Sequence, residues 1–217
     1  MFSGIVQQEA PVLEVLFRED LLRLGITLPL SYGEVVHIGS SLGVDGVCLT
    51  VVSKATTREG LLVRFDVMPV TLASTHLGEL RPGDLVNVES ALKWGDAVGG
   101  HLLSGHVMGK GTVVDIRQKG HDYQLEVECP EDWRLYLFPK GYIALNGVSL
   151  TIQSVEEGRK HTTLTVHLIP ETLRTTNLKR LKAGDTVHVE IDAQTVAIVD
   201  TVRRLCLSDE GKAWTKR

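Results

Sequence analysis

The sequence predicts an all-β protein built from two tandem copies of one unit, followed by a C-terminal helix. Three observations support this fold class: blocks that return at a fixed offset, short β-branched segments between turn residues, and a closing segment with helical apolar spacing. The 217 residues suffice for two small hydrophobic cores.

The internal repeat fixes the organisation of the chain. Three blocks return 101 residues further on: 46–51 as 147–152, 69–75 as 170–176, and 83–89 as 184–190. Between 44–89 and 145–190, 17 of 46 aligned pairs are identical without a gap. Chance similarity would not keep one register across three separate blocks, so the sequence indicates a tandem duplication.

Each unit shows strand-like segments that are rich in apolar or β-branched residues and bounded by turn formers. The clearest are Leu61–Val67, Leu85–Glu89, Tyr123–Glu128 and Leu164–Leu168. Several short strands in a unit of this size favour a small closed barrel, which leaves no exposed sheet edge. A β-sandwich remains the alternative, because periodicity does not separate the two.

The final segment has the spacing of an amphipathic helix without a counterpart in the first half. Its apolar stripe is Ile198, Val199, Val202, Leu205 and Cys206. Asp192 stands before the stripe, where a side chain caps a helix N-terminus. The stripe must be buried across the barrels or against another subunit, and we favour self-association.

Composition excludes several classes of protein. A formal charge of −4 argues against nucleic-acid binding, and no apolar run is long enough to cross a membrane. The N-terminus lacks the features of a signal peptide. Cys48, Cys129 and Cys206 are odd in number and widely spaced, which disfavours a disulfide framework or a zinc site and favours a cytoplasmic location. We expect no metal.

The best-matched block predicts a binding surface. In a strand, Cys48 and Thr50 share one face, and Ser149 and Thr151 share the matching face in the second copy. Small polar side chains beside the same glycine in both copies suit a flat polar ligand. A solvent-facing structural strand explains the pattern about equally well.

Two histidines, His101 and His106, lie in the glycine-rich stretch that joins the copies. No third ligand stands nearby, so a zinc site is not indicated. On the residues alone, interfacial or solvated histidines are the preferred interpretation. No dinucleotide or phosphate loop motif is present.

Taken together, these blocks resemble riboflavin synthase of the alpha-chain type. The resemblance rests on the opening MFSGIV, on DGVCLTV, GGHLLSGH, KGYIALNGVSLT and LIPETL, in that order along nearly the whole chain. It implies two similar six-stranded antiparallel barrels and a C-terminal helix. The implied domains are 1–97, 98–191 and 192–217, the last serving oligomerisation.

The resemblance also implies an activity. The family dismutates two molecules of 6,7-dimethyl-8-ribityllumazine by transferring a four-carbon unit, which gives riboflavin and 5-amino-6-ribitylamino-uracil. It needs no metal or organic cofactor. The implied assembly is a homotrimer whose sites hold two lumazines between subunits, the first barrel of one subunit facing the second barrel of its neighbour.

Site residues follow by position. The implied substrate contacts are Phe2, Thr50, Thr71, His101, Lys140, Ser149, Thr151, Ile169 and Thr172. The implied catalytic residues are Ser41, Cys48, His106 and Asp192. His106 is a candidate proton carrier, while Cys48 and Ser41 are candidates to position or deliver the nucleophile. Asp192 has the competing interpretation of a helix cap.

One position departs from the family pattern. Val70 stands where the family has a glutamate and where the second copy has Glu171. We expect any effect on affinity in the first barrel rather than on the reaction itself.

Two other functions compete with this one. A non-catalytic lumazine or flavin carrier would keep the fold, but the intact glycine–histidine stretch and second copy favour the enzyme. A scaffold for nucleic acid or another partner is disfavoured by the acidic balance and by an aromatic content of 5%.

Overall fold

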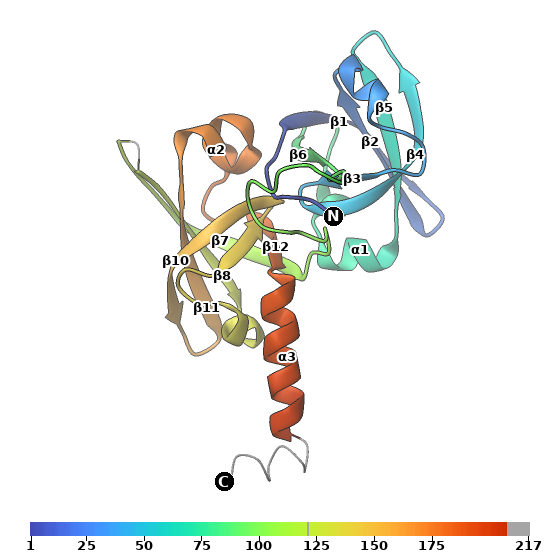
Figure 1. The fold of residues 1–217 in the computed structure, drawn as a ribbon. Coiled ribbons are helices and arrows are strands. Elements are labelled where there is room, and N and C mark those ends of the chain that lie inside the picture. Colours follow the sequence, from blue (N-terminus) through green and yellow to red (C-terminus); the bar gives the residue numbers. More distant parts are fainter. Residues whose placement is uncertain (121, 208–217) are drawn as a thin grey trace.

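A computed structural model describes residues 1–120 and 122–207 of the chain. These residues form two closed antiparallel barrels of six strands each, with a C-terminal helix that projects away from them (Figure 1). The predicted fold class is therefore confirmed. The sandwich alternative is excluded, because each sheet closes on itself.

The first barrel has the strand order β1-β2-β5-β4-β3-β6. Its strands are β1 (Gln8–Arg18), β2 (Leu21–Leu28), β3 (Ser41–Val44), β4 (Val47–Thr56), β5 (Leu61–Val67) and β6 (Leu85–Ser90). Short helices fill the longer connections: α1 (Pro69–Ser74) and 3-10 turns at Leu30–Glu34 and Leu77–Glu79.

The second barrel repeats this arrangement in the order β10-β11-β8-β7-β12-β9. Its strands are β7 (Gly109–Lys119), β8 (Asp122–Pro130), β9 (Tyr142–Leu145), β10 (Val148–Glu157), β11 (His161–Leu168) and β12 (Thr186–Ile191). The connections carry α2 (Pro170–Thr175) and 3-10 turns at Glu131–Tyr136 and Asn177–Arg180.

Alternation of side chains builds both cores. Along β4, Val47, Leu49 and Val51 are buried, and the matching residues of β10 are buried in the same pattern. The intervening Cys48 is half-buried and Thr50 is exposed, so the predicted polar face points out of the barrel.

Bulges occur at matching places in the two barrels. The register of β1 on β2 shifts between Val12 and Glu14, and that of β7 on β8 shifts between Val113 and Asp115. The β4–β5 and β10–β11 pairs carry a second matching shift. Because a bulge bends a strand, this shared pattern helps both sheets to close.

The barrels meet at two hairpin turns. Asp45-Gly46 joins β3 to β4 and Asn146-Gly147 joins β9 to β10, and all four residues have positive φ, as a two-residue type I′ turn requires. A Cβ atom on Gly46 would lie 2.6 Å from the Gly147 nitrogen. Only glycine fits at these touching tips.

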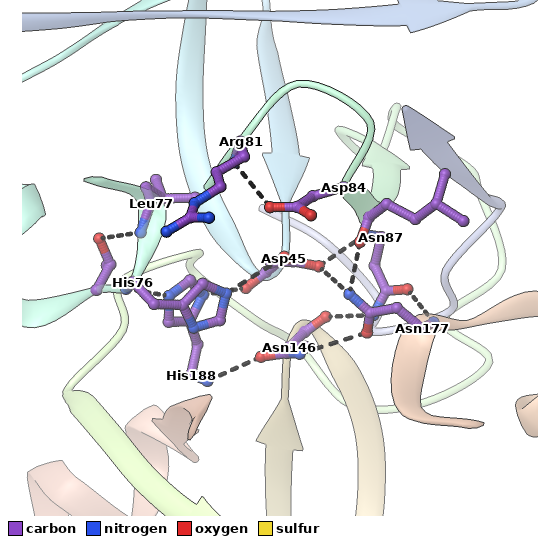
Figure 2. A network of polar contacts seen from close by, with 11 residues as sticks. Asp45, His76, Leu77, Arg81, Asp84, Asn87, Asn146, Asn177 and His188 are labelled. Carbon is purple, nitrogen blue, oxygen red and sulfur yellow. Dashed lines mark hydrogen bonds and ion pairs between the residues drawn. The ribbon is translucent and has the colours of Figure 1, made fainter. Parts of the chain in front are cut away.

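Buried polar side chains around these turns lock the barrels together (Figure 2). Asp45 accepts hydrogen bonds from the Asn87 N–H at 2.7 Å and from the Asn177 amide at 2.8 Å. Across the junction, His188 contacts the Asp45 carbonyl at 2.8 Å and stacks on His76, with ring centroids 3.7 Å apart. These contacts join residues of the first barrel to residues of the second.

Helix α3 (Ala193–Leu207) begins directly after the last strand. Val196 and Val199 pack against the second barrel, and the Tyr136 hydroxyl donates to Asp200 at 2.6 Å. Ile198 and Val202 are exposed, so part of the predicted stripe is uncovered in this chain. The rest of the expected segment 192–217, from residue 208, lies outside the described residues.

Within the two described ranges, no helix has the length and apolar character needed to cross a membrane.

Candidate functional site

Each barrel forms a backbone hydrogen bond with the segment that precedes the other barrel. The N-terminal lead-in segment (residues 1–7) presents the Gly4 carbonyl, which accepts a hydrogen bond from the Ser149 N–H at 2.8 Å. The linker lead-in segment (residues 99–108) presents the Gly105 carbonyl to the Cys48 N–H at 2.9 Å. The exchange places both lead-in segments beside the strands predicted to bind ligand.

Two buried glutamates hold the lead-in segments. Glu89 accepts from the Ser3 N–H and hydroxyl, both at 2.7 Å, and Glu190 accepts from the same groups of Ser104 at the same distance. Burial raises the pKa of Glu89, and the hydrogen bonds from Ser3 oppose that shift. The sequence analysis did not single out either glutamate, although both close a repeated block.

An open cleft of about 470 Å³ lies on the second barrel. It collects all five residues implied for this half-site, namely Lys140, Ser149, Thr151, Ile169 and Thr172. The remaining lining residues are Ile5, Gly99, Gly100, Tyr142, Leu150, Gln153 and His167. The cleft therefore joins strands β10 and β11, helix α2 and both lead-in segments.

The cleft suits a flat polar ligand. Ser149 and Thr151 offer hydroxyl groups from β10, Thr172 offers one from α2, and Ile169 supplies an apolar wall. Lys140 has a left-handed backbone conformation (φ 69°), and its N–H donates a hydrogen bond to the Ile152 carbonyl. Hydroxyls and one ammonium beside apolar surface match such a ligand.

His101 does not line this cleft but contacts two residues that do, Ser149 and Tyr142. Its Nδ1 lies 2.6 Å from the Ser149 hydroxyl, and its ring stacks on Tyr142 with centroids 4.9 Å apart. Burial lowers the pKa of His101, and the Asp192 carboxylate partly opposes this shift. Of the two interpretations, interfacial or solvated, burial excludes the solvated one for His101, whereas His106 is exposed.

The matching face of the first barrel carries the other predicted group. Ser41 and Thr50 are register partners on β3 and β4, and Cys48 lies between them and the lead-in carbonyl of Gly105. Thr71 stands on α1, at the place that Thr172 occupies on α2.

Phe2 lies deeper than expected. It is 3% exposed and packs with Leu103 and Ala144 between the barrels, where Cys48 also contacts this cluster. Its ring approaches the position of a Cβ on Gly43 to 3.3 Å. Phe2 is therefore part of the apolar cluster against which Cys48 packs.

The structure separates the two histidines of the linker. His106 is exposed and directly follows Gly105, the residue bound to Cys48. In the repeat it takes the place of Ile5, which lines the second-barrel cleft. By its position in the repeat, His106 corresponds to a residue that lines the cleft of the other barrel, whereas His101 packs against Ser149.

Asp192 caps helix α3. Its carboxylate accepts from the Thr195 N–H at 2.9 Å and from the Thr195 hydroxyl at 2.8 Å, which is N-cap geometry. Its charge also acts on His101. The hydrogen bonds to Thr195 support the cap interpretation.

Sequence reasoning did not select Tyr142, Gln153 or His167, which line the same cleft. Gln153 continues the face of Ser149 and Thr151, so strand alternation could have found it. His167 contacts Asp122 at 2.6 Å. The role of Tyr142 depends on the exchanged lead-in segment, for which the sequence carries no local signal.

The departure at Val70 has a local explanation. The counterpart Glu171 forms a two-point ion pair with Arg174 on exposed α2 and does not line the cleft. In α1, Val70 and Ala73 replace that pair together. The change therefore removes a surface ion pair, which contributes little free energy.

Across residues 1–120 and 122–207, no group of three or more candidate ligands could hold a metal ion.

Comparisons with known proteins agree with this geometry. The family model for the lumazine binding domain matches residues 3–91 and 104–192. The riboflavin synthase of Chlamydia pneumoniae is 44% identical over 98% of this chain and 100% of the relative. That of Escherichia coli (strain K12) is 39% identical over 97% of this chain and 96% of the relative.

Solved structures are similar as well. The crystal structure of LumP complexed with 6,7-dimethyl-8-(1'-D-ribityl) lumazine has a TM-score of 0.75 and 29% identity, covering 88% of this chain and 99% of LumP. LumP complexed with flavin mononucleotide has a TM-score of 0.76 at the same identity and coverage. Because both halves match the domain and the relatives align over nearly their full lengths, the chain belongs to the riboflavin synthase family.

Proposed function

We propose that the protein is a transferase that converts two molecules of 6,7-dimethyl-8-ribityllumazine into riboflavin and 5-amino-6-ribitylamino-uracil. One lumazine donates a four-carbon unit and the other accepts it. We propose that the reaction uses no metal or organic cofactor. It would take place in the cytoplasm, in keeping with free thiols at Cys48, Cys129 and Cys206.

One observation carries this proposal: the chain holds two related half-sites whose chemistry differs. Ser149 and Lys140 line the second-barrel cleft with His101 against Ser149, whereas Cys48 and Ser41 lie on the matching strands of the first barrel. Dismutation needs two copies of one heterocycle in opposed orientations with unequal roles. Holding both in contact removes much of the entropic barrier to their reaction.

We propose that each complete site forms between the first barrel of one subunit and the second barrel of its neighbour, within a homotrimer. Exposed Ile198 and Val202 on α3 offer an apolar surface for that association. Each site would hold two lumazines, one on each half-site.

In this site, one lumazine loses a proton from its C7 methyl group and the other accepts a nucleophile at C7. His106 is the proposed proton carrier, because its exposed imidazole can both accept and donate a proton. Cys48 and Ser41 would position or deliver the attacking group on the acceptor. The hydroxyls of Thr50 and Thr71 would bind the first lumazine, as those of Thr151 and Thr172 would bind the second.

The test mixes purified full-length protein with the lumazine and follows riboflavin absorbance, while light scattering measures the mass in solution. Turnover by a trimer supports the proposal. Tight lumazine binding without riboflavin formation would identify a carrier of the same fold and overturn the enzymatic proposal. Turnover by a monomer would overturn the composite site.

A further inference from the structure

Two residues that line the second-barrel cleft, Tyr142 and Ser149, both contact the buried His101, and the first barrel has no equivalent of this arrangement. The His101 ring lies parallel to Tyr142, with 14° between the planes, and its Nδ1 is 2.6 Å from the Ser149 hydroxyl. His101 is 7% exposed, whereas Tyr142 is 50% exposed at the cleft wall. The outer ring thus covers the inner one.

The hydrogen bonds of His101 are limited to one side of its ring. Its Nε2 is buried and has no partner among the described residues. A doubly protonated ring would bury an unsatisfied charged N–H there, so the neutral ring is favoured. The Nδ1–H form leaves only a lone pair at Nε2 and donates to Ser149. The Ser149 hydroxyl hydrogen is then free to point at a bound ligand.

The repeat shows that this arrangement is not needed to build a barrel. Ser41 stands at the place of Tyr142 and Cys48 at that of Ser149, so the first barrel has neither the aromatic ring nor the hydroxyl. Both barrels nevertheless close with the same strand order and matching bulges. The His101–Tyr142 stack therefore serves the cleft rather than the fold.

We propose that Tyr142 is a positioning residue that holds His101 over Ser149 and so directs the Ser149 hydroxyl toward the lumazine in the second-barrel cleft. The identity of this ligand rests on the proposed function. The Tyr142 hydroxyl makes no hydrogen bond to the described residues, so its ring is the active part. A phenylalanine at this position keeps the ring that stacks on His101. A leucine keeps an apolar side chain but has no ring to stack.

The experiment compares Tyr142→Leu with the matched control Tyr142→Phe in the full chain. Four quantities are measured: kcat and KM for 6,7-dimethyl-8-ribityllumazine, the Kd for riboflavin, and the His101 titration by NMR. The control keeps kcat within about twofold. The leucine variant loses about tenfold in kcat or more, as expected for a misdirected hydrogen bond, with a smaller change in KM.

The NMR titration separates the two roles, because the loss of a residue that only contacts the ligand would leave the His101 titration unchanged. Without the covering ring, the pKa of His101 rises toward the ordinary value near ~6.5, while Asp192 and Lys140 stay in place in both variants. An unchanged titration with a loss only in KM would show that Tyr142 is merely a contact surface, and would overturn the proposal. Tyr142 is half-exposed, and unfolding midpoints measured alongside confirm that both variants fold.

Failure of the proposed function gives a different result. If the wild-type protein binds riboflavin but forms none from lumazine, the enzymatic proposal fails. In that case the positioning role is decided by the His101 titration and the riboflavin Kd. A Kd weakened only in the leucine variant together with a raised His101 pKa supports the role, and an unchanged His101 titration refutes it.

Discussion

His188 makes for the second barrel the hydrogen bonds that Asn87 makes for the first. The Asn87 amide donates to the Asn146 carbonyl at 2.9 Å and accepts from the Asn177 N–H at 2.7 Å. The His188 ring contacts the Asp45 carbonyl at 2.8 Å and accepts from the His76 N–H at 2.9 Å. These contacts require Nδ1–H and a bare Nε2, so the ring is neutral and of one tautomer.

This pairing predicts a pH dependence of stability. Burial lowers the pKa of His188 to about 3, whereas the unfolded chain has the ordinary value of 6.5. The unfolded state therefore binds more protons between these values, and stability is lost as the pH falls below 6.5. From pH 7 to pH 5 the expected loss from this residue is about 2 kcal/mol. Urea unfolding at both pH values measures it.

His188→Asn introduces an asparagine, the residue found at the equivalent position 87 of the first barrel. Because asparagine does not titrate, the contribution of His188 to the pH dependence of stability disappears. The exposed His37→Asn serves as a control that keeps the wild-type slope. An equal slope in wild type and His188→Asn would contradict the neutral, buried assignment.

Gly105→Ala tests the exchanged lead-in segment. The new Cβ would lie 2.5 Å from the Cys48 Cβ at a residue with φ of 79°, so the strand pairing beside Cys48 must open. We expect a loss of about 3 kcal/mol in the free energy of unfolding, from steric overlap and strain together. Gly120→Ala has a similar φ of 63° and open space, and it isolates the strain, worth about 1 kcal/mol. Equal losses in chemical denaturation would refute the close contact.

His106→Gln tests the proposed proton carrier. The exposed side chain does not support the core, so folding and riboflavin affinity are expected to stay near wild type. Removing a general acid–base group lowers kcat by about 10²-fold. Steady-state kinetics across pH 5 to 8 measure the loss. A variant with wild-type kcat throughout would assign the proton transfer to another group.

Asp192 is tested by two substitutions. Asp192→Ala removes the hydrogen bonds to Thr195 and should cost about 1 kcal/mol, and Asp192→Asn restores most of that stability. The asparagine variant lacks the carboxylate that the family resemblance implies to be catalytic, so we expect turnover to fall although the helix is intact. Full turnover with Asp192→Asn would leave the cap as the role of this residue. Thermal unfolding and the lumazine assay give the two readings.

Association through α3 is tested by placing a charge on its exposed stripe. Ile198→Glu is expected to lower the solution mass to that of a monomer and to abolish turnover, because each proposed site needs two subunits. Ala197→Glu adds the same charge outside the stripe and should leave the assembly unchanged. Sedimentation measures the mass. A trimer formed by the Ile198→Glu chain would place the interface elsewhere.

Much of the fold could be predicted because the duplication repeats every local signal. The strand Leu61–Val67 has its predicted bounds, and the helix follows Asp192 as its spacing indicates. The second-barrel cleft was predictable in part, since Ser149 and Thr151 share a strand face. The Tyr142–His101 stack was not, because residues from β9 and a distant linker meet only through the exchange of lead-in segments.

The inter-barrel network escaped sequence reasoning for a similar reason. His76 lies in a connection of the first barrel and His188 in strand β12 of the second, and no periodic pattern links them. Their stacking follows from the angle between the barrels, which only the three-dimensional arrangement defines.

The crossed lead-in segments also bear on how such a chain could evolve. Two separate copies of one unit, crossing in this way, would always build a pair of equal pockets. Encoding both units in one gene gives each pocket its own codons, so serine and cysteine could be selected at equivalent places. Mutation could therefore make the two pockets different from one another only after the two copies were joined in one chain.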